Sequence, residues 1–369
     1  MVKVSTLVAG ASMGVANAIA APAELATRAN CTFNSATQAN TSKSGCSVIH
    51  LNNIAVPAGV TLDLTGLKPG TSVIFEGTTT FGHAKWAGPL ISVSGTNIQV
   101  SGAPGHLIDG NGAAWWDGKG TNNPAENMKP KFFAAHKLLG KSTIKGLQVK
   151  NTPVQAFSTD GSSGLTIDNV TINNADGDKG DLAHNTDGFD VGNSQDITIQ
   201  NCHVTNQDDC LAVNSGTNIK FLGNTCIGGH GISIGSVGGR DNNVVNGVTV
   251  KDCTVQNSDN GVRIKTVAGA TGSVTGVTFD GITLQDISKN GIVIQQDYQN
   301  GRPTGTPTSG VPIKQITLNN IHGNVLSGGT DIYILCASCS NWKAKLIKIT
   351  GGTKANTCTG IPSGSGLPC

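Results

Sequence analysis

The sequence predicts an all-β chain wound into a parallel β-helix, a solenoid with a cap over its N-terminal end. Three observations lead to this fold class: abundant glycine, a repeated pair of short β-like runs, and repeat intervals too short for a propeller. Of the 369 residues, 50 are glycine, and only 4% are aromatic. Glycine disfavours helices by roughly 1 kcal/mol relative to alanine. The composition therefore suits many short strands joined by tight turns.

The repeat begins at about residue 164 and has two parts. An alternating run such as Leu165–Ile167 or Val248–Val250 precedes a second run that starts at a polar turn. The second runs share a reference position at residues 187, 209, 230, 260 and 290, at intervals of 22, 21, 30 and 30 residues. Such intervals are typical of a solenoid, whereas propeller blades need ~40 residues. An open solenoid end exposes strand edges, so we expect an N-terminal cap.

The N-terminus has the pattern of a secretory signal. Lys3 is followed by an apolar stretch and then by small residues that allow cleavage after Ala18 or Ala20. An uncleaved tail is the alternative. We expect a secreted, extracellular protein divided into a signal peptide over 1–20, a propeptide over 21–28 and a single β-helical catalytic domain over 29–369.

Secretion places the ten cysteines in an environment where disulfides persist. Cys202 and Cys253 fall two coils apart, or ~10 Å, which is too far for a disulfide, so we predict two free, buried thiols. The other eight form local pairs, although the C-x-x-C pair is alternatively a redox dithiol: Cys31–Cys46, Cys210–Cys226, Cys336–Cys339 and Cys358–Cys369. N-glycosylation acceptor patterns begin at Asn30, Asn40 and Asn169.

Stacking of the coils brings charged side chains together, because equivalent positions lie ~4.8 Å apart. The reference position places Asp187, Asp209 and His230 in one column, with Asp208 one residue earlier. Crowded carboxylates cannot all ionise cheaply, so one should keep its proton at mildly acidic pH. A protonated carboxyl group beside ionised ones is what glycoside hydrolysis requires.

Two cations adjoin this column. Arg263 follows Asp190, Ala212 and Ser233 in a second column, and Lys265 lies one column further. Cations beside hydrolytic carboxylates indicate a substrate that carries carboxylates of its own. They also disfavour a calcium site, so we expect no metal and no cofactor. Net charge is only +2 and no apolar run is long enough to cross a membrane, so we expect no nucleic-acid or membrane partner.

Four motifs in order carry a family resemblance: Asn185-Thr186-Asp187, Asp208-Asp209, Gly229-His230-Gly231 and Arg263-Ile264-Lys265. Together they make residues 31–369 resemble the fungal endopolygalacturonases of glycoside hydrolase family 28, which degrade pectin. The resemblance implies a right-handed β-helix and inverting hydrolysis of α-1,4-galacturonosyl linkages. It also implies the role of each catalytic residue: Asp208 is the general acid, Asp187 and Asp209 hold the attacking water, and His230 assists the protonation state of the acid. The residues that it implies as substrate contacts are Arg263, Lys265, Asn185 and Tyr298.

The Gly229-His230-Gly231 region looks more like that of endo-acting than exo-acting members, and no long insertion blocks the expected cleft. An exo-polygalacturonase and a non-catalytic β-helical carbohydrate binder remain alternatives. Tyr298 is either a sugar-stacking residue or a packed loop residue. The expected partners are polygalacturonate or pectin and plant inhibitor proteins, and we expect a monomer.

Overall fold

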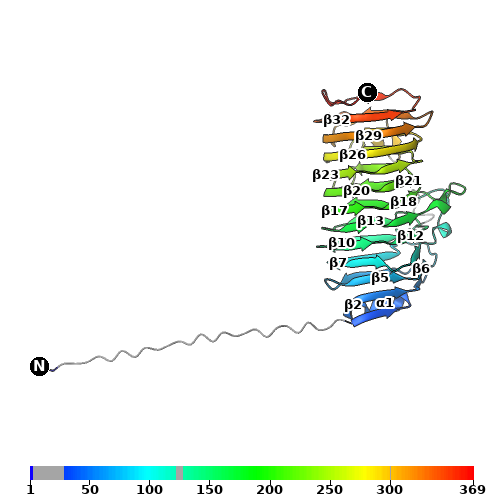
Figure 1. The fold of residues 1–369 in the computed structure, drawn as a ribbon, viewed down its shortest axis with the longest axis vertical. Coiled ribbons are helices and arrows are strands. Elements are labelled where there is room, and N and C mark those ends of the chain that lie inside the picture. The colour runs from blue at the N-terminus through cyan, green and yellow to red at the C-terminus, as the bar shows by residue number, and fades with distance from the viewer. Residues whose placement is uncertain (3–28, 122–127, 300) are drawn as a thin grey trace.

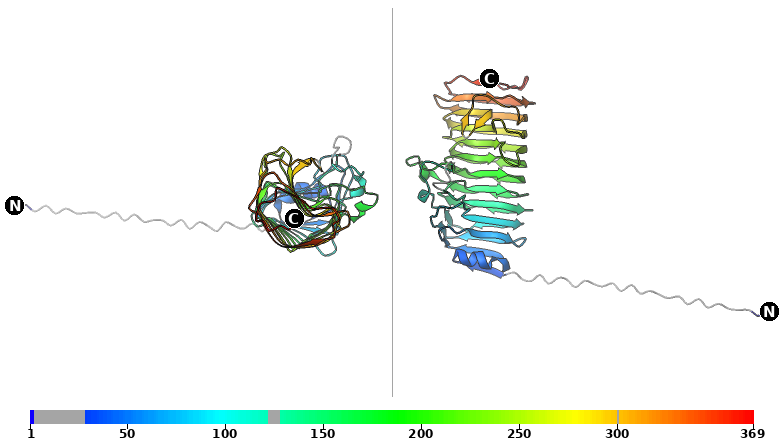
Figure 2. Two further views of the ribbon diagram at one scale, coloured as in Figure 1. Left: turned by 90° about the horizontal axis from the view of Figure 1, so that it is seen from above. Right: turned by 180° about the vertical axis from the view of Figure 1, so that it is seen from behind.

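The computed structural model describes residues 1–2, 29–121, 128–299 and 301–369. The predicted signal peptide and propeptide lie outside the described residues, except for residues 1–2. The described chain winds as a right-handed parallel β-helix, the hand that parallel crossover connections almost always take. Figures 1 and 2 show the coils stacked in chain order from the N-terminal helix to the C-terminus.

One sheet receives a strand from each successive coil, so its order follows the chain. Every neighbouring pair along this path is parallel, and only the short β28 pairs antiparallel, with β27. Its 12 strands are β4 (Leu62–Leu67), β7 (Ile91–Thr96), β10 (Phe133–Leu139), β13 (Phe157–Asp160), β16 (Phe189–Gly192), β19 (Asp209–Val213), β22 (Gly231–Val237), β25 (Asn260–Val267), β27 (Asn290–Gln299), β28 (Arg302–Pro303), β30 (Thr330–Leu335) and β33 (Thr357–Thr359).

The other sheet contains two ladders that meet at a corner, which gives each middle coil three faces. The long strands β26 and β29 bend around this corner and belong to both ladders. Its 21 strands are β1 (Ala29–Phe33), β2 (Cys46–Asn52), β3 (Ala55–Val56), β5 (Ser72–Glu76), β6 (Thr78–Phe81), β8 (Gln99–Gly102), β9 (Leu107–Asp109), β11 (Thr143–Lys145), β12 (Gln148–Lys150), β14 (Thr166–Asp168), β15 (Thr171–Asn173), β17 (Ser194–Gln200), β18 (His203–Asn206), β20 (Gly216–Leu222), β21 (Thr225–Gly228), β23 (Val244–Lys251), β24 (Thr254–Gln256), β26 (Ser273–Ile287), β29 (Ile313–Val325), β31 (Cys339–Ser340) and β32 (Lys343–Thr350).

A single left-handed residue turns the chain at the corner between the two ladders. Glycine adopts this conformation freely, and Asn and Asp tolerate it better than other residues. This requirement explains why the same position recurs as Gly, Asn or Asp along the chain. The corner residues with positive φ are Asn53, Gly77, Gly146, Asn169, Asn201, Gly223, Asp252, Gly281, Asn320 and, in the last coil, Leu346.

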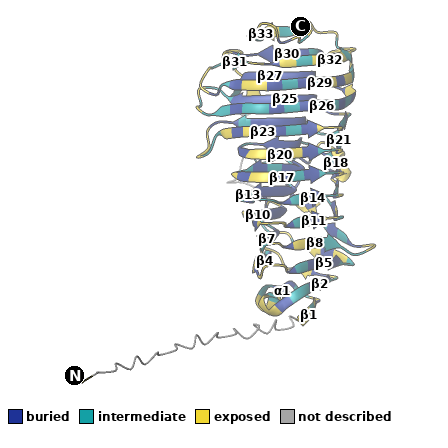
Figure 3. Cartoon of the chain, turned by 60° about the vertical axis from the view of Figure 1, so that its left-hand side comes forward, coloured by how far each residue is buried: buried dark blue, intermediate teal, exposed yellow. Residues whose placement is uncertain are grey.

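The interior of the solenoid is one continuous apolar core, shown in dark blue in Figure 3. Phe133, Phe157 and Phe189 occupy one register position on three successive coils. Their ring centroids lie 5.0 and 5.5 Å apart in stacked pairs. The last ring of the stack, Phe189, lies two residues after Asp187 in the coil that carries the first acidic motif.

The expected N-terminal cap is present as α1 (Ala36–Ser42), which buries Ala36 and Ala39 against the core. Asn40 joins this helix to the first coil, because its amide donates to the Thr61 carbonyl and accepts from the Asp63 amide, each at 2.8 Å. The remaining helices are short 3₁₀ turns: η1 (Lys43–Gly45), η2 (Gly112–Ala114) and η3 (Ala175–Asp178). No helix in the described ranges has both the length and the apolar character needed to span a membrane.

The strand register agrees with the predicted second column but corrects the first. Asp190, Ala212, Ser233 and Arg263 are paired along the ladder as expected. Asp209, however, pairs with Gly231 rather than His230. A bulge at Cys210 adds one residue to β19, which moves the imidazole along the strand. As a result the backbone amide of His230 donates to the Asp208 carbonyl at 2.8 Å.

The structure joins the cysteines in the four expected local pairs, with Cα separations of 5.7–6.1 Å. Cys202 and Cys253 are free and buried. Burial raises the pKa of each thiol to about 12, which leaves almost no reactive thiolate at neutral pH.

Thiol titration tests this assignment. We expect the native protein to react with no more than a trace of a thiol reagent, because both free sulfurs lie in the core. The unfolded, unreduced chain should expose two thiols per molecule. A chain with none would mean that Cys202 and Cys253 are oxidised, and a chain with four would mean that one local disulfide is absent.

Candidate active site

A polar cleft of about 1130 Å³ runs along the coils on the side of the sheet that contains β13 to β30. The structure brings all eight predicted site residues into its lining: Asp187, Asp208, Asp209, His230, Arg263, Lys265, Asn185 and Tyr298. Ser158 of β13 and Tyr333 of β30 also line it. These strands are separated by six coil steps of ~4.8 Å, so the cleft is long enough for a polymer.

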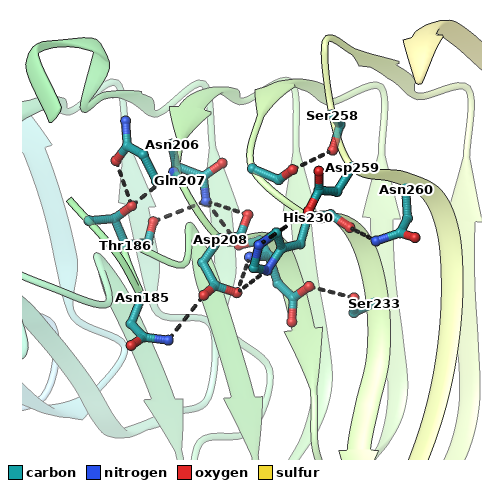
Figure 4. A network of polar contacts seen from close by, with 12 residues as sticks. Asn185, Thr186, Asn206, Gln207, Asp208, His230, Ser233, Ser258, Asp259 and Asn260 are labelled. Atoms are coloured by element: carbon teal, nitrogen blue, oxygen red, sulfur yellow. Dashed lines mark hydrogen bonds and ion pairs between the residues drawn. The ribbon is translucent and has the colours of Figure 1, made fainter. Parts of the chain in front are cut away.

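Asp208 is held by three groups at the centre of the cleft (Figure 4). Its Oδ1 lies 2.9 Å from Nδ1 of His230 and accepts the amide of Asp209 at 2.7 Å. Its Oδ2 accepts the side-chain amide of Asn185 at 3.0 Å. The carboxylate is thus fixed in one orientation before any substrate arrives, and the imidazole is its only cationic hydrogen-bond partner in the described residues.

Asn206 fixes the backbone beneath this pair. Its Nδ2 lies 3.0–3.1 Å from the carbonyl oxygens of Thr186, Asp208 and Asp209. Beside it, the Thr186 hydroxyl donates to Gln207 Oε1 at 2.8 Å and accepts the Gln207 amide at 2.9 Å. These side chains connect the two coils that present the acidic motifs.

Asp209 forms a buried ion pair with Lys265. Lys265 Nζ lies 2.6 Å from Oδ2, and the two side chains are only 7% and 3% exposed. The Ser233 hydroxyl donates to the other carboxylate oxygen at 2.6 Å. Both oxygens of Asp209 are therefore bound, which stabilises its negative charge and weakens it as a direct nucleophile.

Asp187 lies on the preceding coil and forms no salt bridge with any described residue, although the charge of Lys265 acts on it from a distance. Burial raises its pKa well above the usual value, and the charges of Asp208, Asp190 and Asp209 raise it further. Its buried Oδ1 has no hydrogen-bond partner among the described residues. Burial likewise raises the pKa of Asp190 to about 6, although Lys131 opposes the shift. Both shifts favour the protonated form of these two carboxyl groups at mildly acidic pH.

In the Asp208–His230 pair, hydrogen bonding and charge outweigh the effect of burial on both pKa values, unlike at Asp187. Burial by itself would raise the pKa of Asp208, but the hydrogen bond and charge of His230, followed by the charge of Lys265, lower it to about 2. Burial lowers the pKa of His230, but the hydrogen bond and charge of Asp208 outweigh that effect, and the net shift is upward. These opposite shifts of the two pKa values favour an ionised Asp208 carboxylate beside a protonated His230 ring.

The predicted substrate contacts surround this centre. Arg263 Cζ lies 5.6 Å and Lys265 Nζ 5.2 Å from the centre of the Tyr298 ring. The buried Nε of Arg263 has no hydrogen-bond partner among the described residues. Asn185 accepts from the Thr121 amide at 2.9 Å and donates one amide hydrogen to Asp208, and its second amide hydrogen has no acceptor among the described residues.

Within the described ranges, Asp208, Asp209 and His230 form a group compact enough to hold a metal ion, with one ligand atom from each within 4.8 Å of the others. The donor set does not fit a divalent cation. Lys265 already neutralises Asp209, and the raised pKa of His230 favours an imidazolium, which has no lone pair for a metal. We therefore assign no metal to this group.

The sequence interpretation missed several residues at the site. Ser233 was placed beside the cluster without a role, and Asn206 was not identified. Asp259, whose Oδ2 lies 3.6 Å from Nε2 of His230, was also missed. Its signal was available, because Asp259 precedes the reference residue Asn260 just as Asp208 precedes Asp209.

The three glycosylation patterns differ in their surroundings. Asn30 and Asn169 are exposed. Asn40 is half-buried, and both polar atoms of its amide bind the first coil. A glycan on Asn40 would have to displace those hydrogen bonds, so the structure favours Asn30 and Asn169 as acceptors.

Comparison with known proteins places this fold and site in a family of glycoside hydrolases. The model of the family described as "Glycosyl hydrolases family 28" matches residues 46–369. Endopolygalacturonase 1 of Colletotrichum lindemuthianum is 59% identical over 362 residues, which cover 98% of each chain. A polygalacturonase of Penicillium griseoroseum is 60% identical over 346 residues, covering 92% of this chain and 91% of that protein.

A solved structure gives the same result. Endopolygalacturonase I from Stereum purpureum, in complex with two galacturonates, superposes with a TM-score of 0.81 at 41% identity, covering 89% of this chain and 96% of that one. The chain therefore belongs to glycosyl hydrolases family 28.

The buried Asp209–Lys265 pair generates a stability prediction. Lys265→Met leaves the Asp209 carboxylate buried without its cation, and we expect the free energy of unfolding to fall by about 3–5 kcal/mol. Denaturant unfolding at neutral pH measures the loss. The matched control is Lys289→Met, which breaks an exposed pair and should cost under ~1 kcal/mol.

The double variant Asp209→Asn/Lys265→Met should recover most of the lost stability, because no unpaired charge remains. If the single and double variants were equally destabilised, packing of the lysine stem rather than its charge would be the cause.

Proposed function

We propose that this chain is an endo-acting polygalacturonase that hydrolyses α-1,4-galacturonosyl linkages in polygalacturonate and pectin. The observation that carries this proposal is the hydrogen-bonded Asp208–His230 pair beside the Asp209–Lys265 ion pair, in a long cleft lined by Arg263 and Lys265. The endopolygalacturonase names of the similar proteins support the same activity.

The acid in this proposal is the Asp208–His230 pair rather than Asp208 alone. With a pKa of about 2, Asp208 would not by itself carry a proton at mildly acidic pH. Its Oδ1 lies 2.9 Å from the imidazole Nδ1, so His230 can transfer a proton to Asp208, and Asp208 then donates that proton to the leaving glycosidic oxygen. Activity is lost at alkaline pH, where His230 gives up its proton.

Asp209 and Asp187 hold the attacking water. Asp209 is paired with Lys265 and is available as the base. Asp187 has an unsatisfied Oδ1 that a water molecule can bind. Arg263, with its unpartnered Nε, and Lys265 bind the carboxylates of the substrate near the scissile bond. Tyr298 and the free amide hydrogen of Asn185 contact the sugar.

We propose that hydrolysis inverts the anomeric configuration, as the resemblance implies. One oxygen of Asp208 lies within 4.8 Å of one oxygen of Asp209, whereas the acid and base of inverting enzymes are typically ~6.5–9.5 Å apart. The engagement of both Asp209 oxygens by Ser233 and Lys265 nevertheless favours activation of water over direct attack.

Several further properties belong to the proposal. The protein would be secreted after removal of residues 1–20, trimmed after Arg28, glycosylated at Asn30 and Asn169, and monomeric. Plant inhibitor proteins would be its macromolecular partners.

Product analysis tests the activity. At low conversion of polygalacturonate, at mildly acidic pH and with chelator present, we expect mixed oligomers, because the cleft accommodates an internal stretch of polymer. Proton NMR of the same digest should show the β-anomer first, as inversion requires. Monomer alone would indicate exo action, ultraviolet-absorbing ends a lyase, and no product a non-catalytic binder.

Asp208→Asn tests the acid. The amide preserves shape but cannot donate the proton, and we expect turnover to fall at least ~10²-fold, the scale of general acid catalysis, with the fold retained by circular dichroism. The control is Asp252→Asn, an exposed corner residue with positive φ that asparagine tolerates. Undiminished turnover in Asp208→Asn would remove Asp208 from the mechanism.

A further inference from the structure

Asp259 and Lys289 occupy equivalent turns on successive coils at the edge of the cleft. Each precedes a reference asparagine, Asn260 or Asn290, and the two asparagines are paired in the ladder. The Lys289 amide also donates to the Asp259 carbonyl at 2.8 Å. The Asp259 side chain is 24% exposed and that of Lys289 is 65% exposed. Both line the cleft, and the proposed mechanism uses neither.

One carboxylate oxygen of Asp259 faces two competing cations. Oδ2 lies 2.6 Å from Nζ of Lys289 and 3.6 Å from Nε2 of His230. The Ser288 hydroxyl donates to Oδ1 at 3.0 Å and holds the group in place. Figure 4 shows Asp259 on the opposite side of His230 from Asp208. The imidazole therefore lies between two carboxylates, one at each ring nitrogen.

This arrangement favours the doubly protonated ring, because Asp208 is hydrogen-bonded to one ring nitrogen and the Asp259 carboxylate lies at ion-pair distance from the other, where both stabilise positive charge on the ring. The charged groups that face His230 are Asp208 and Asp209 from the β19 turn and Asp259 from the β25 turn. Lys265 reaches this set through Asp209, and Lys289 reaches it through Asp259. Of these groups, only Lys289 is largely exposed.

We propose that Asp259 is a positioning residue that stabilises the protonated form of His230 and so sets how strongly the imidazole holds the catalytic proton. Lys289 has the opposite effect, because its ammonium group pairs with the same carboxylate oxygen of Asp259. The inference rests on the proposed function, in which the Asp208–His230 pair is the acid. The negative charge of Asp259 raises the proton affinity of the imidazole. Lys289 lowers that affinity in two ways: its own positive charge repels the imidazolium, and its ion pair with Asp259 neutralises part of the carboxylate charge.

The test uses two variants of the full chain that must act in opposite directions. Asp259→Asn removes the anion, so the His230 pKa and the alkaline limb of kcat should move to lower pH by about one unit. Lys289→Gln removes the competing cation, so both should move to higher pH by roughly half as much. In the double variant, Lys289→Gln should have little further effect, because its target is gone.

The ionisation of His230 is read directly by NMR of histidine-labelled protein, with the resonance assigned from a His230→Asn variant. Lys251→Gln is the matched control, because it removes an exposed cation at the end of β23. It should leave the His230 titration unchanged. The alkaline limb of kcat is followed separately on polygalacturonate.

Two results would overturn the inference: an unchanged His230 titration in Asp259→Asn, or shifts of the same sign in both variants. Lys289→Gln changes only an exposed side chain, so it remains informative if Asp259→Asn does not fold. Failure of the proposed function is distinguishable, because it would abolish hydrolysis in every variant while the NMR titrations still reported the coupling.

Discussion

The parallel register between successive coils is the constraint on which the rest of the structure depends. Each coil lies ~4.8 Å from the next, so a residue type repeated at one position is brought against its own copies. In the core this produces the stack of Phe133, Phe157 and Phe189. At the surface the same rule forces Asp187 and Asp209 onto adjacent coils. The fold that buries the apolar residues thus also concentrates like charges in the cleft.

That concentration determines how protons are distributed at the site. Each carboxylate in the cluster meets the repulsion differently: Asp209 through Lys265, Asp208 through His230, and Asp187 by a raised pKa. The result is a ligand-free protein with one ionised carboxylate beside an imidazolium and another carboxyl group that favours its proton. Proton donation and water activation both require neighbouring carboxyl groups with different proton affinities. This difference arises because each carboxyl group faces a different cation or none.

The repeat interval was sufficient for the fold class, for the stacking and for the grouping of the acidic motifs with His230, Arg263 and Lys265, whereas Asn185 and the role of each residue came from the family resemblance. It was not sufficient for contacts that depend on a shift of one residue. Because of the bulge at Cys210, His230 lies beside Asp208 instead of beside Asp209. A periodic sequence pattern cannot predict such a bulge. Asp259 could have been found from its place before Asn260. The distances that make it face both Lys289 and His230 depend on side-chain geometry, which the sequence does not determine.

The most direct test of the account is a crystal structure of the Asp208→Asn variant with a bound galacturonate oligomer that spans the cleft. The account predicts a glycosidic oxygen within hydrogen-bond reach of residue 208, a water molecule between Asp187 and Asp209, and a uronate carboxylate on Arg263 or Lys265. A glycosidic oxygen closer to Asp187 or Asp209 than to residue 208 would contradict it, because the acid would then have been assigned to the wrong carboxyl group.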